Sequence, residues 1–369
     1  MTKVKLIIKL FLFNLLVVGL AFLLIEGISS TIIFYRTLQN TKPVAERLHT
    51  RYDPELGWVN IPNTTIENMY GPGLSVRINA QGFRNDEDFT EEIPPGKVRL
   101  ICSGDSFTFS FGVDNKQTWC YLLSTLNPHW QTVNMGQGGY GIDQAYLWYK
   151  RDGARLKHNI QIFAFITADF DRMQRGIFLG YGKPILKVEN DQLIIDNVPV
   201  PRQGFVLPWT TTPYQAAFDE LRSVQLLRQT FFQNQDTSKP PIDEPAVQAV
   251  AEKILEDLVR LNQERNSTLV LVYLPVQASR RPDLKTDTRR RYISQGAAAN
   301  NIVFIDLVED FRKLPEDDID ELFIPNGAID FPGAAGHYSA KGNEYIAHRL
   351  YEELTTRPEL AERLDLANN

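Results

Sequence analysis

From residue 98 onward, short apolar runs alternate along the chain with longer stretches whose apolar residues recur at helical spacing. The apolar runs predict strands at 98–102, 132–134, 160–167, 268–274 and 302–307. The helical spacing predicts helices around 118–126, 143–155, 214–234, 243–265, 283–299 and 339–354. Buried strands that alternate with helices favour a mainly parallel sheet covered on both faces. The pattern therefore predicts an α/β domain over residues 98–369.

Two segments depart from this alternation. Residues 37–97 are rich in turn formers and short alternating runs, which predict a small β-rich lead-in before the first buried strand. Residues 185–188 and 192–195, joined by Glu189-Asn190-Asp191, predict a β-hairpin. We expect this hairpin and the two helices after it, which Lys239-Pro240-Pro241 separates, to form an insertion of about 172–265.

The N-terminal pattern predicts a membrane helix. Lys3, Lys5 and Lys9 precede an apolar stretch at 10–25, which continues beyond Glu26 to Tyr35. Because roughly 20 apolar residues span a bilayer, this stretch is long enough only if Glu26 lies near the far interface. We expect residues 1–36 to form a cytoplasmic N terminus and one transmembrane anchor, with the main domain outside the cytoplasm. A cleaved signal peptide is the alternative, although no Ala-x-Ala-like site follows.

Composition narrows the possible partners. The 369 residues carry a net charge of −6, and no basic cluster is large enough for a nucleic-acid footprint. The two cysteines, Cys102 and Cys120, do not make a disulfide framework; we expect buried thiols, with a single bridge left open. No Cys/His spacing suggests zinc, and no Walker or dinucleotide fingerprint is present, so neither a metal nor a cofactor is expected.

The first buried strand ends in the segment with the most chemistry. Gly104-Asp105-Ser106 follows the apolar run, where Gly104 permits a sharp turn and Asp105 a helix cap. Ser106 would project from the carboxyl end of a strand, where open α/β sheets place their ligands. It is a candidate nucleophile if a base lies nearby. A structural turn with a capping serine explains the same residues.

A base and a set of oxyanion donors can be found in the sequence. Of the five histidines, His337 stands in a loop directly before the last helix, which can return to the carboxyl edge of the sheet. Helix capping is the alternative role for it. The glycine-rich loop 134–141 follows a strand and can bring backbone N–H groups close to a ligand. A tight structural turn is the alternative there.

Together these segments resemble the SGNH (GDSL-like) hydrolase superfamily. Gly104-Asp105-Ser106 looks like its first block, Asn134 followed by Gly139 like its second, and His337 followed by Gly342 like its last. The resemblance implies a flavodoxin-like three-layer αβα sandwich. It also implies Ser106 as nucleophile, His337 as base, and the backbone N–H groups of Ser106 and Gly139 as oxyanion donors.

The lead-in adds a narrower resemblance. The runs at 53–58 (Asp-Pro-Glu-Leu-Gly-Trp) and 79–84 (Asn-Ala-Gln-Gly-Phe-Arg) are similar to those of bacterial envelope members, of the exopolysaccharide-associated type. That likeness implies an acylated glycan as substrate.

Two positions depart from the family pattern. Ala168 stands where the third block has an asparagine whose side chain donates to the oxyanion. Loss of one such donor costs on the order of 100- to 1000-fold in rate; Thr167 or a residue of the insertion is a possible substitute. Ala334 and Ala335 stand where an aspartate precedes the histidine, and Asp330 is the nearest upstream carboxylate. Either Asp330 or a backbone carbonyl is expected to orient His337.

Two functions from different classes follow. The first is a membrane-anchored serine esterase or acyltransferase that acts on ester groups, O-acetyl above all, of an extracytoplasmic glycan or another small ester. The second is a catalytically weak SGNH-like module that binds glycan or scaffolds an envelope assembly. Ala168 and Ala334 favour the second, whereas Ser106 and His337 favour the first. No protein partner is predicted.

Overall fold

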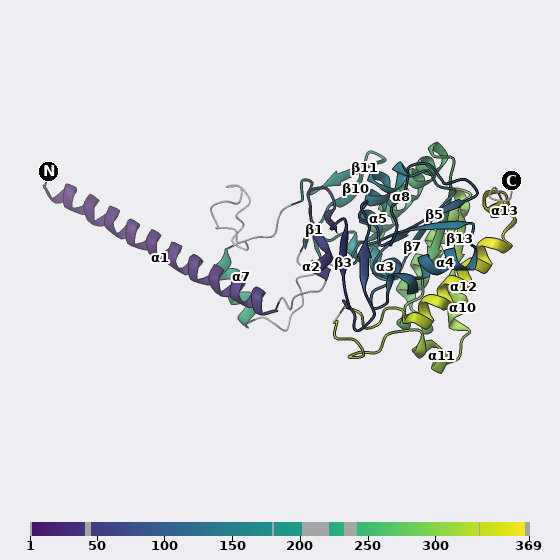
Figure 1. Ribbon diagram of the computed structural model, residues 1–369. Coiled ribbons are helices and arrows are strands. Elements are labelled where there is room, and N and C mark those ends of the chain that lie inside the picture. The colour runs from purple at the N-terminus through teal and green to yellow at the C-terminus, as the bar shows by residue number, and fades with distance from the viewer. Residues whose placement is uncertain are drawn as a thin grey trace. The chain divides into compact units, whose positions relative to one another are not determined.

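The computed structural model describes residues 2–40, 46–178, 181–200, 221–231, 242–331 and 333–365. The chain divides into two compact units (Figure 1). The smaller comprises Met1–Pro43 with Gln203–Pro241, and the larger comprises Val44–Arg202 with Ile242–Asn369. All the candidate site residues belong to the larger unit.

A five-stranded sheet forms the centre of the larger unit. Its strands are β5 (Val98–Gly104), β6 (Trp130–Gly136), β7 (Ile160–Phe165), β12 (Thr268–Tyr273) and β13 (Val303–Asp306). They lie in the order β6-β5-β7-β12-β13, and every neighbouring pair is parallel. This is the 2-1-3-4-5 order of doubly wound, flavodoxin-like sheets. The predicted α/β fold is confirmed.

Helices cover both faces of the sheet (Figure 1). Along β5, Leu100 and Cys102 belong to one apolar cluster and Ile101 to another, because successive side chains of a strand point to opposite faces. The principal helices are α4 (Trp119–Leu126), α5 (Ile142–Arg151), α8 (Glu244–Glu264), α9 (Leu284–Ala299) and α12 (Ala340–Thr356). Cys102 and Cys120 are buried free thiols, as the sequence predicts.

Shorter helices lie between these elements. The sequence did not predict most of them, because each is too short to show helical periodicity. They are α2 (Glu46–His49), α3 (Ser106–Phe109), α6 (Thr167–Arg172), α10 (Leu307–Arg312), α11 (Glu316–Glu321) and α13 (Pro358–Asp365).

The predicted insertion is smaller than 172–265. Helix α8 matches the helix expected at 243–265, but its residues Ile254 and Leu258 are fully buried in the main core. It is therefore the crossover helix between β7 and β12. The helix expected at 214–234 is observed as α7 (Arg222–Phe231), which belongs to the smaller unit. Residues 214–220, 232–234 and 239–241 lie outside the described residues.

The predicted hairpin is present and is joined to the core by a buried ion pair. Strands β10 (Ile185–Glu189) and β11 (Gln192–Asp196) pair antiparallel, after the short strands β8 (Ile177–Phe178) and β9 (Tyr181–Gly182). Lys183 Nζ lies 2.6 Å from Asp143 Oδ2, and both side chains are fully buried. The same Nζ donates to the Arg172 carbonyl at 2.6 Å. Burial lowers the pKa of Lys183, and Asp143 opposes that effect.

The lead-in is β-rich, as predicted, and packs into the same core. Strands β1 (Thr50–Asp53) and β2 (Gly57–Asn60) form one antiparallel pair, and β3 (Thr64–Ile66) and β4 (Val76–Ile78) form another. Trp58 is 2% exposed within the main apolar cluster. The lead-in is therefore part of the larger unit.

Candidate active site

The candidate nucleophile lies at the carboxyl end of β5, the first strand of the sheet along the chain. Asp105 caps helix α3: its Oδ1 accepts the Phe107 N–H at 2.8 Å, and Ser106 is the first helical residue. A Cβ on Gly104 would lie 2.3 Å from Thr108 Oγ1 and 2.4 Å from the Ala164 carbonyl oxygen. Glycine is thus required by the close packing of α3 on the sheet, rather than by the sharp turn that we predicted.

The structure brings His337 to this serine. His337 Nε2 lies 2.8 Å from Ser106 Oγ, across 231 positions of sequence. The imidazole packs against the rings of Phe107 and Phe111, with centroids 4.6 and 5.2 Å away. The pair has the geometry of a nucleophile and its general base.

The surroundings keep His337 neutral. Burial lowers the pKa of His337 to about 4, while the Asp105 carboxylate raises it and the Arg172 guanidinium lowers it. At neutral pH the imidazole is therefore uncharged. Its Nε2 can then accept the Ser106 proton, provided that the tautomer carries hydrogen on Nδ1.

No carboxylate orients the far side of this imidazole. His337 Nδ1 is buried and has no hydrogen-bond partner in the described part of the chain. The carbonyls of Ala334 and Gly333 raise the pKa of His337 to a smaller extent, but neither forms a hydrogen bond of normal geometry with Nδ1. Asp330 is exposed, and the structure does not bring it to the ring, contrary to our expectation. The site is a dyad.

The glycine-rich loop after β6 lies beside the nucleophile turn. Gly136 pairs with Gly104, and the Gln137 N–H donates to the Gly104 carbonyl at 3.1 Å. Gly139 has a φ of +76°, which favours glycine, and its N–H donates to no acceptor among the described residues. Ser106, as the first residue of α3, has no acceptor for its N–H within that helix. Two backbone donors are therefore available to an oxyanion at this edge.

These features occur together in one arrangement. A parallel sheet of order 2-1-3-4-5 carries a serine after its first strand and a glycine loop after its second, and a histidine precedes the last long helix. This is the arrangement that the resemblance to the SGNH hydrolases predicts.

Comparison with known proteins found similar solved structures at low sequence identity. Similar solved structures include a member of the lipolytic protein G-D-S-L family from Veillonella parvula (14% identity, TM-score 0.38, covering 70% of this chain and 99% of that one). The lipase/acylhydrolase from Enterococcus faecalis is 13% identical, with a TM-score of 0.40 over 70% of this chain and 96% of its own. Axe2, an acetylxylan esterase from Geobacillus stearothermophilus, is 15% identical, with a TM-score of 0.39 over 71% and 95%. No family model and no curated protein matches the sequence. At these identities the matches do not assign an activity to this chain.

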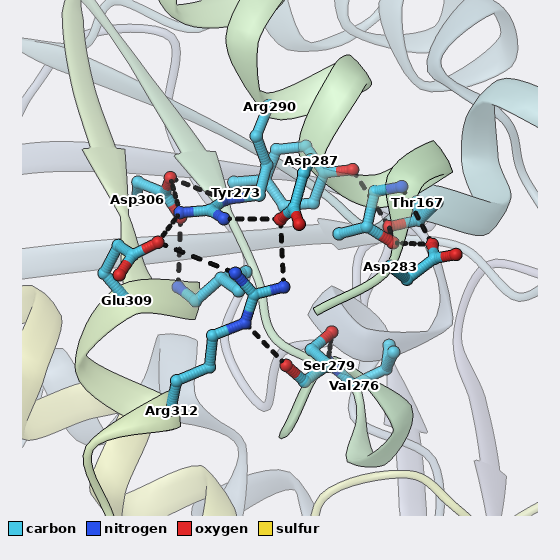
Figure 2. A network of polar contacts seen from close by, with 12 residues as sticks. Thr167, Tyr273, Val276, Ser279, Asp283, Asp287, Arg290, Asp306, Glu309 and Arg312 are labelled. Atoms are coloured by element: carbon cyan, nitrogen blue, oxygen red, sulfur yellow. Dashed lines mark hydrogen bonds and ion pairs between the residues drawn. The ribbon is translucent and has the colours of Figure 1, made fainter. Parts of the chain in front are cut away.

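Ala168 leaves the third donor of the SGNH pattern empty, and Thr167 does not replace it. Thr167 Oγ1 lies 2.9 Å from Tyr273 Oη and 3.0 Å from Thr286 Oγ1, and its carbonyl accepts from Arg289. Figure 2 shows Thr167 beside Tyr273 within a polar network, in which the Thr286 hydroxyl donates in turn to Asp283. The insertion's Lys183 is likewise bound to Asp143. Neither Thr167 nor Lys183 therefore supplies the missing donor.

Restoring this donor tests its importance. Ala168 is only partly buried, so an asparagine side chain can be accommodated there. We expect Ala168→Asn to raise kcat for aryl acetate hydrolysis by up to about 100-fold, because one more donor reaches the oxyanion. Ala168→Leu, which has the same shape but no donor, is the matched control and should give no gain. Equal rates in the parent and the Asn variant would show that a third donor already exists.

Arg172 is the site residue that the sequence did not reveal. Its Nη1 donates to Asp169 Oδ1 at 2.6 Å and to the Tyr140 carbonyl at 2.7 Å, and it lies 3.3 Å from Asp105 Oδ2. Burial and the nearby Asp105 carboxylate raise the pKa of Asp169 well above its usual range, which Arg172 opposes. One guanidinium therefore holds the residue before Ser106 and the residue after Gly139. The Asp169–Arg172 spacing on one helix face was its only signal in the sequence.

Two residues of the lead-in motifs, Trp58 and Arg84, form hydrogen bonds with the glycine-rich loop 134–141 and with the residue after α3. Trp58 Nε1 donates to the Gly138 carbonyl at 2.9 Å, and Tyr140 Oη donates to the Trp58 carbonyl. Arg84, only 2% exposed, donates through Nη1 to the Ser110 carbonyl at 2.7 Å and so supports the end of α3. Burial lowers the pKa of Arg84 to about 10, which leaves it charged. These contacts give Trp58, in the run at 53–58, and Arg84, in the run at 79–84, a structural role beside the candidate site.

Among the described residues, no group of three or more His, Cys, Asp or Glu side chains is arranged to hold a metal ion. The contact between Ser106 Oγ and His337 Nε2 has the geometry that nucleophilic attack by a serine with a histidine base requires.

Proposed function

We propose that this protein is a serine esterase that forms an acyl-enzyme on Ser106. The observation that carries the proposal is the 2.8 Å contact between Ser106 Oγ and His337 Nε2 at the carboxyl edge of the sheet. Ser106 Oγ attacks the ester carbonyl carbon as its proton passes to His337 Nε2. The negative charge on the carbonyl oxygen is met by the Ser106 and Gly139 N–H groups.

The same two residues complete the turnover. The imidazolium gives its proton to the departing alcohol oxygen, and the carbonyl re-forms as an ester of Ser106. A water molecule, or a sugar hydroxyl in acyl transfer, then attacks that ester and gives its proton to His337. Asp105 favours the imidazolium of these steps, since its carboxylate raises the pKa of His337.

The confined site favours a small acyl group. Ser106 is 4% exposed, and the Phe107 and Phe111 rings pack against the base. Acetyl fits such a site better than a long acyl chain does. We propose O-acetyl groups of an extracytoplasmic glycan as the substrate, on the strength of the lead-in resemblance and the placement given by the N-terminal helix.

The protein is proposed to act at a membrane. Val4–Arg36 is a helix apolar and long enough to span a bilayer. Lys3, Lys5 and Lys9, before and within it, support a cytoplasmic N terminus and an active site outside the cytoplasm.

A second candidate function is a weakly active module that binds glycan. Ala168 and the unpartnered Nδ1 of His337 favour it, because both reduce support for the transition state.

One experiment separates the two functions. The full-length protein in detergent is treated with a fluorophosphonate probe and, separately, with aryl acetate and aryl octanoate. We expect labelling and turnover, with acetate preferred, and the loss of both in Ser106→Ala. Ser124→Ala, a serine on α4 away from this edge, is the matched control and should behave as the parent does. Identical behaviour of the parent and Ser106→Ala would leave only the binding function.

A further inference from the structure

Helix α1 (Thr2–Asn40) has two parts with different surfaces. Every residue from 4 to 25 is exposed, and nearly all are apolar. From Glu26 onward one face is covered: Glu26 is 1% exposed, and Ser29 and Ser30 are each 5% exposed. Ile33 and Arg36, partly covered, continue the same face at helical spacing. We call Glu26, Ser29, Ser30, Ile33 and Arg36 the polar stripe.

Helix α7 covers the polar stripe. The Glu26 carboxylate accepts the backbone N–H groups of Arg222 at 2.7 Å and Ser223 at 3.1 Å, and also the Ser223 hydroxyl. These hydrogen bonds join the N-terminal end of α7 to Glu26 of α1. At the other end, Arg36 Nη1 donates to Thr230 Oγ1 at 3.2 Å. The two helices therefore run parallel, side by side (Figure 1).

This contact explains an acidic residue in an apolar helix. A carboxylate near a bilayer is costly unless it is paired, and the N–H groups and positive dipole end of a helix satisfy it. The 22 residues at 4–25 extend about 33 Å at 1.5 Å each, close to the thickness of the hydrocarbon core. Glu26 thus stands where the bilayer ends, and the polar stripe begins at its outer surface.

We infer that α7 is a second membrane-attachment helix, docked on the polar stripe of α1 and resting on the lipid at the outer surface of the bilayer. The partner is the lipid–water interface. Leu227 is 54% exposed and Val224, one turn earlier, is partly exposed, so α7 keeps apolar side chains uncovered next to its contact with α1. Amphipathic helices of this kind lie in the plane of the interface. The inference rests on the membrane anchoring in the proposed function, but not on the esterase activity.

Two consequences follow for the chain. Glu26 bonds to residues 196 and 197 positions away, so the inference requires α1 to stay in the folded protein rather than to be removed as a leader. The chain also crosses between the two units three times, near residues 43, 202 and 241. The catalytic unit is therefore attached to the membrane through its own inserted segment as well as through α1.

Cross-linking tests the docking. In the full-length protein reconstituted into phosphatidylethanolamine–phosphatidylglycerol vesicles, a protease site is placed between residues 43 and 44. Arg36→Cys with Thr230→Cys should form a disulfide on mild oxidation, so that α1 stays joined to the catalytic unit after cleavage. Tyr35→Cys with Thr230→Cys, on the opposite face of α1, is the matched control and should not. Equal cross-linking of the two pairs, or recovery of protein already cut after α1, overturns the inference.

Sedimentation of the cleaved vesicles tests the lipid contact. Without any cross-link, the cleaved catalytic unit should remain largely with the vesicles. Glu26→Leu, which removes the acceptor for α7, and Leu227→Asp, which places charge on its apolar face, should each release it. Release of the unsubstituted protein would overturn the attachment. Fluorophosphonate labelling of Ser106 is measured in parallel and should be unchanged in both variants, so a failure here is separate from a failure of the esterase proposal.

Discussion

Replacing His337 with alanine should lower kcat for aryl acetate hydrolysis by about 10⁴-fold, the upper range for loss of a general base. Ser106 Oγ would then keep its proton during attack, because His337 Nε2 is its proton acceptor at 2.8 Å. Fluorophosphonate labelling should slow in parallel, since it needs the same activated oxygen. Steady-state rates and labelling rates, compared with the parent at pH 7, measure the effect. Retention of most of the activity would exclude the dyad.

The dependence of kcat/KM on pH is a second test of His337 as the base. Only the neutral imidazole accepts a proton, and burial lowers the pKa of His337 to about 4. The value of kcat/KM should therefore fall as the pH drops through about 4 and be level near pH 6. An unperturbed histidine would put this acid limb near pH 6.5. A limb at that higher pH would show that the imidazole is more solvated or better paired than the structure describes.

Replacing Arg172 with methionine should produce the second largest effect. It removes the donor to the Tyr140 carbonyl, which holds the Gly139 loop, and the counterion of Asp105 and Asp169. We expect kcat to fall by about 100- to 1000-fold, as for a lost oxyanion donor, with little change in KM. Breaking the buried ion pair should also lower the free energy of unfolding by about 3–5 kcal/mol. Steady-state kinetics and denaturant unfolding measure the two effects.

A pH shift distinguishes positioning by Arg172 from general damage to the fold. The Arg172 charge lowers the pKa of His337, so its removal should move the acid limb of kcat/KM to higher pH. Arg172→Lys keeps the charge, and should restore the limb and most of the stability but less of kcat. Arg175→Met, one turn further along the chain, is the matched control. If Arg172→Met loses activity with an unshifted limb, its role is structural alone.

The sequence by itself determined the strands of the central sheet, the long helices and the two candidate reacting groups. Strands and helices show in local periodicity, because a strand buried on both faces needs an unbroken apolar run and a helix needs apolar residues every three to four positions. Ser106 and His337 could be predicted because each follows or precedes such an element, and the ends of parallel strands meet at one edge. The lead-in motifs were visible in the sequence as patterns. Their contacts with the Gly138 and Ser110 carbonyls were not.

Only the tertiary structure decided which side chains meet. The sequence placed Asp330 near enough to orient His337 and made Thr167 a possible oxyanion donor, but Asp330 is exposed and Thr167 Oγ1 bonds to Tyr273 and Thr286 instead. Arg172 and Lys183 were missed because their partners Tyr140, Asp105 and Asp143 lie 30 or more positions away. The same is true of Glu26, which appeared only as an interruption of an apolar helix until Ser223 was found beside it. Periodicity reports which face of an element is buried, whereas a hydrogen bond or ion pair depends on distances of a few ångströms that only the packed chain sets.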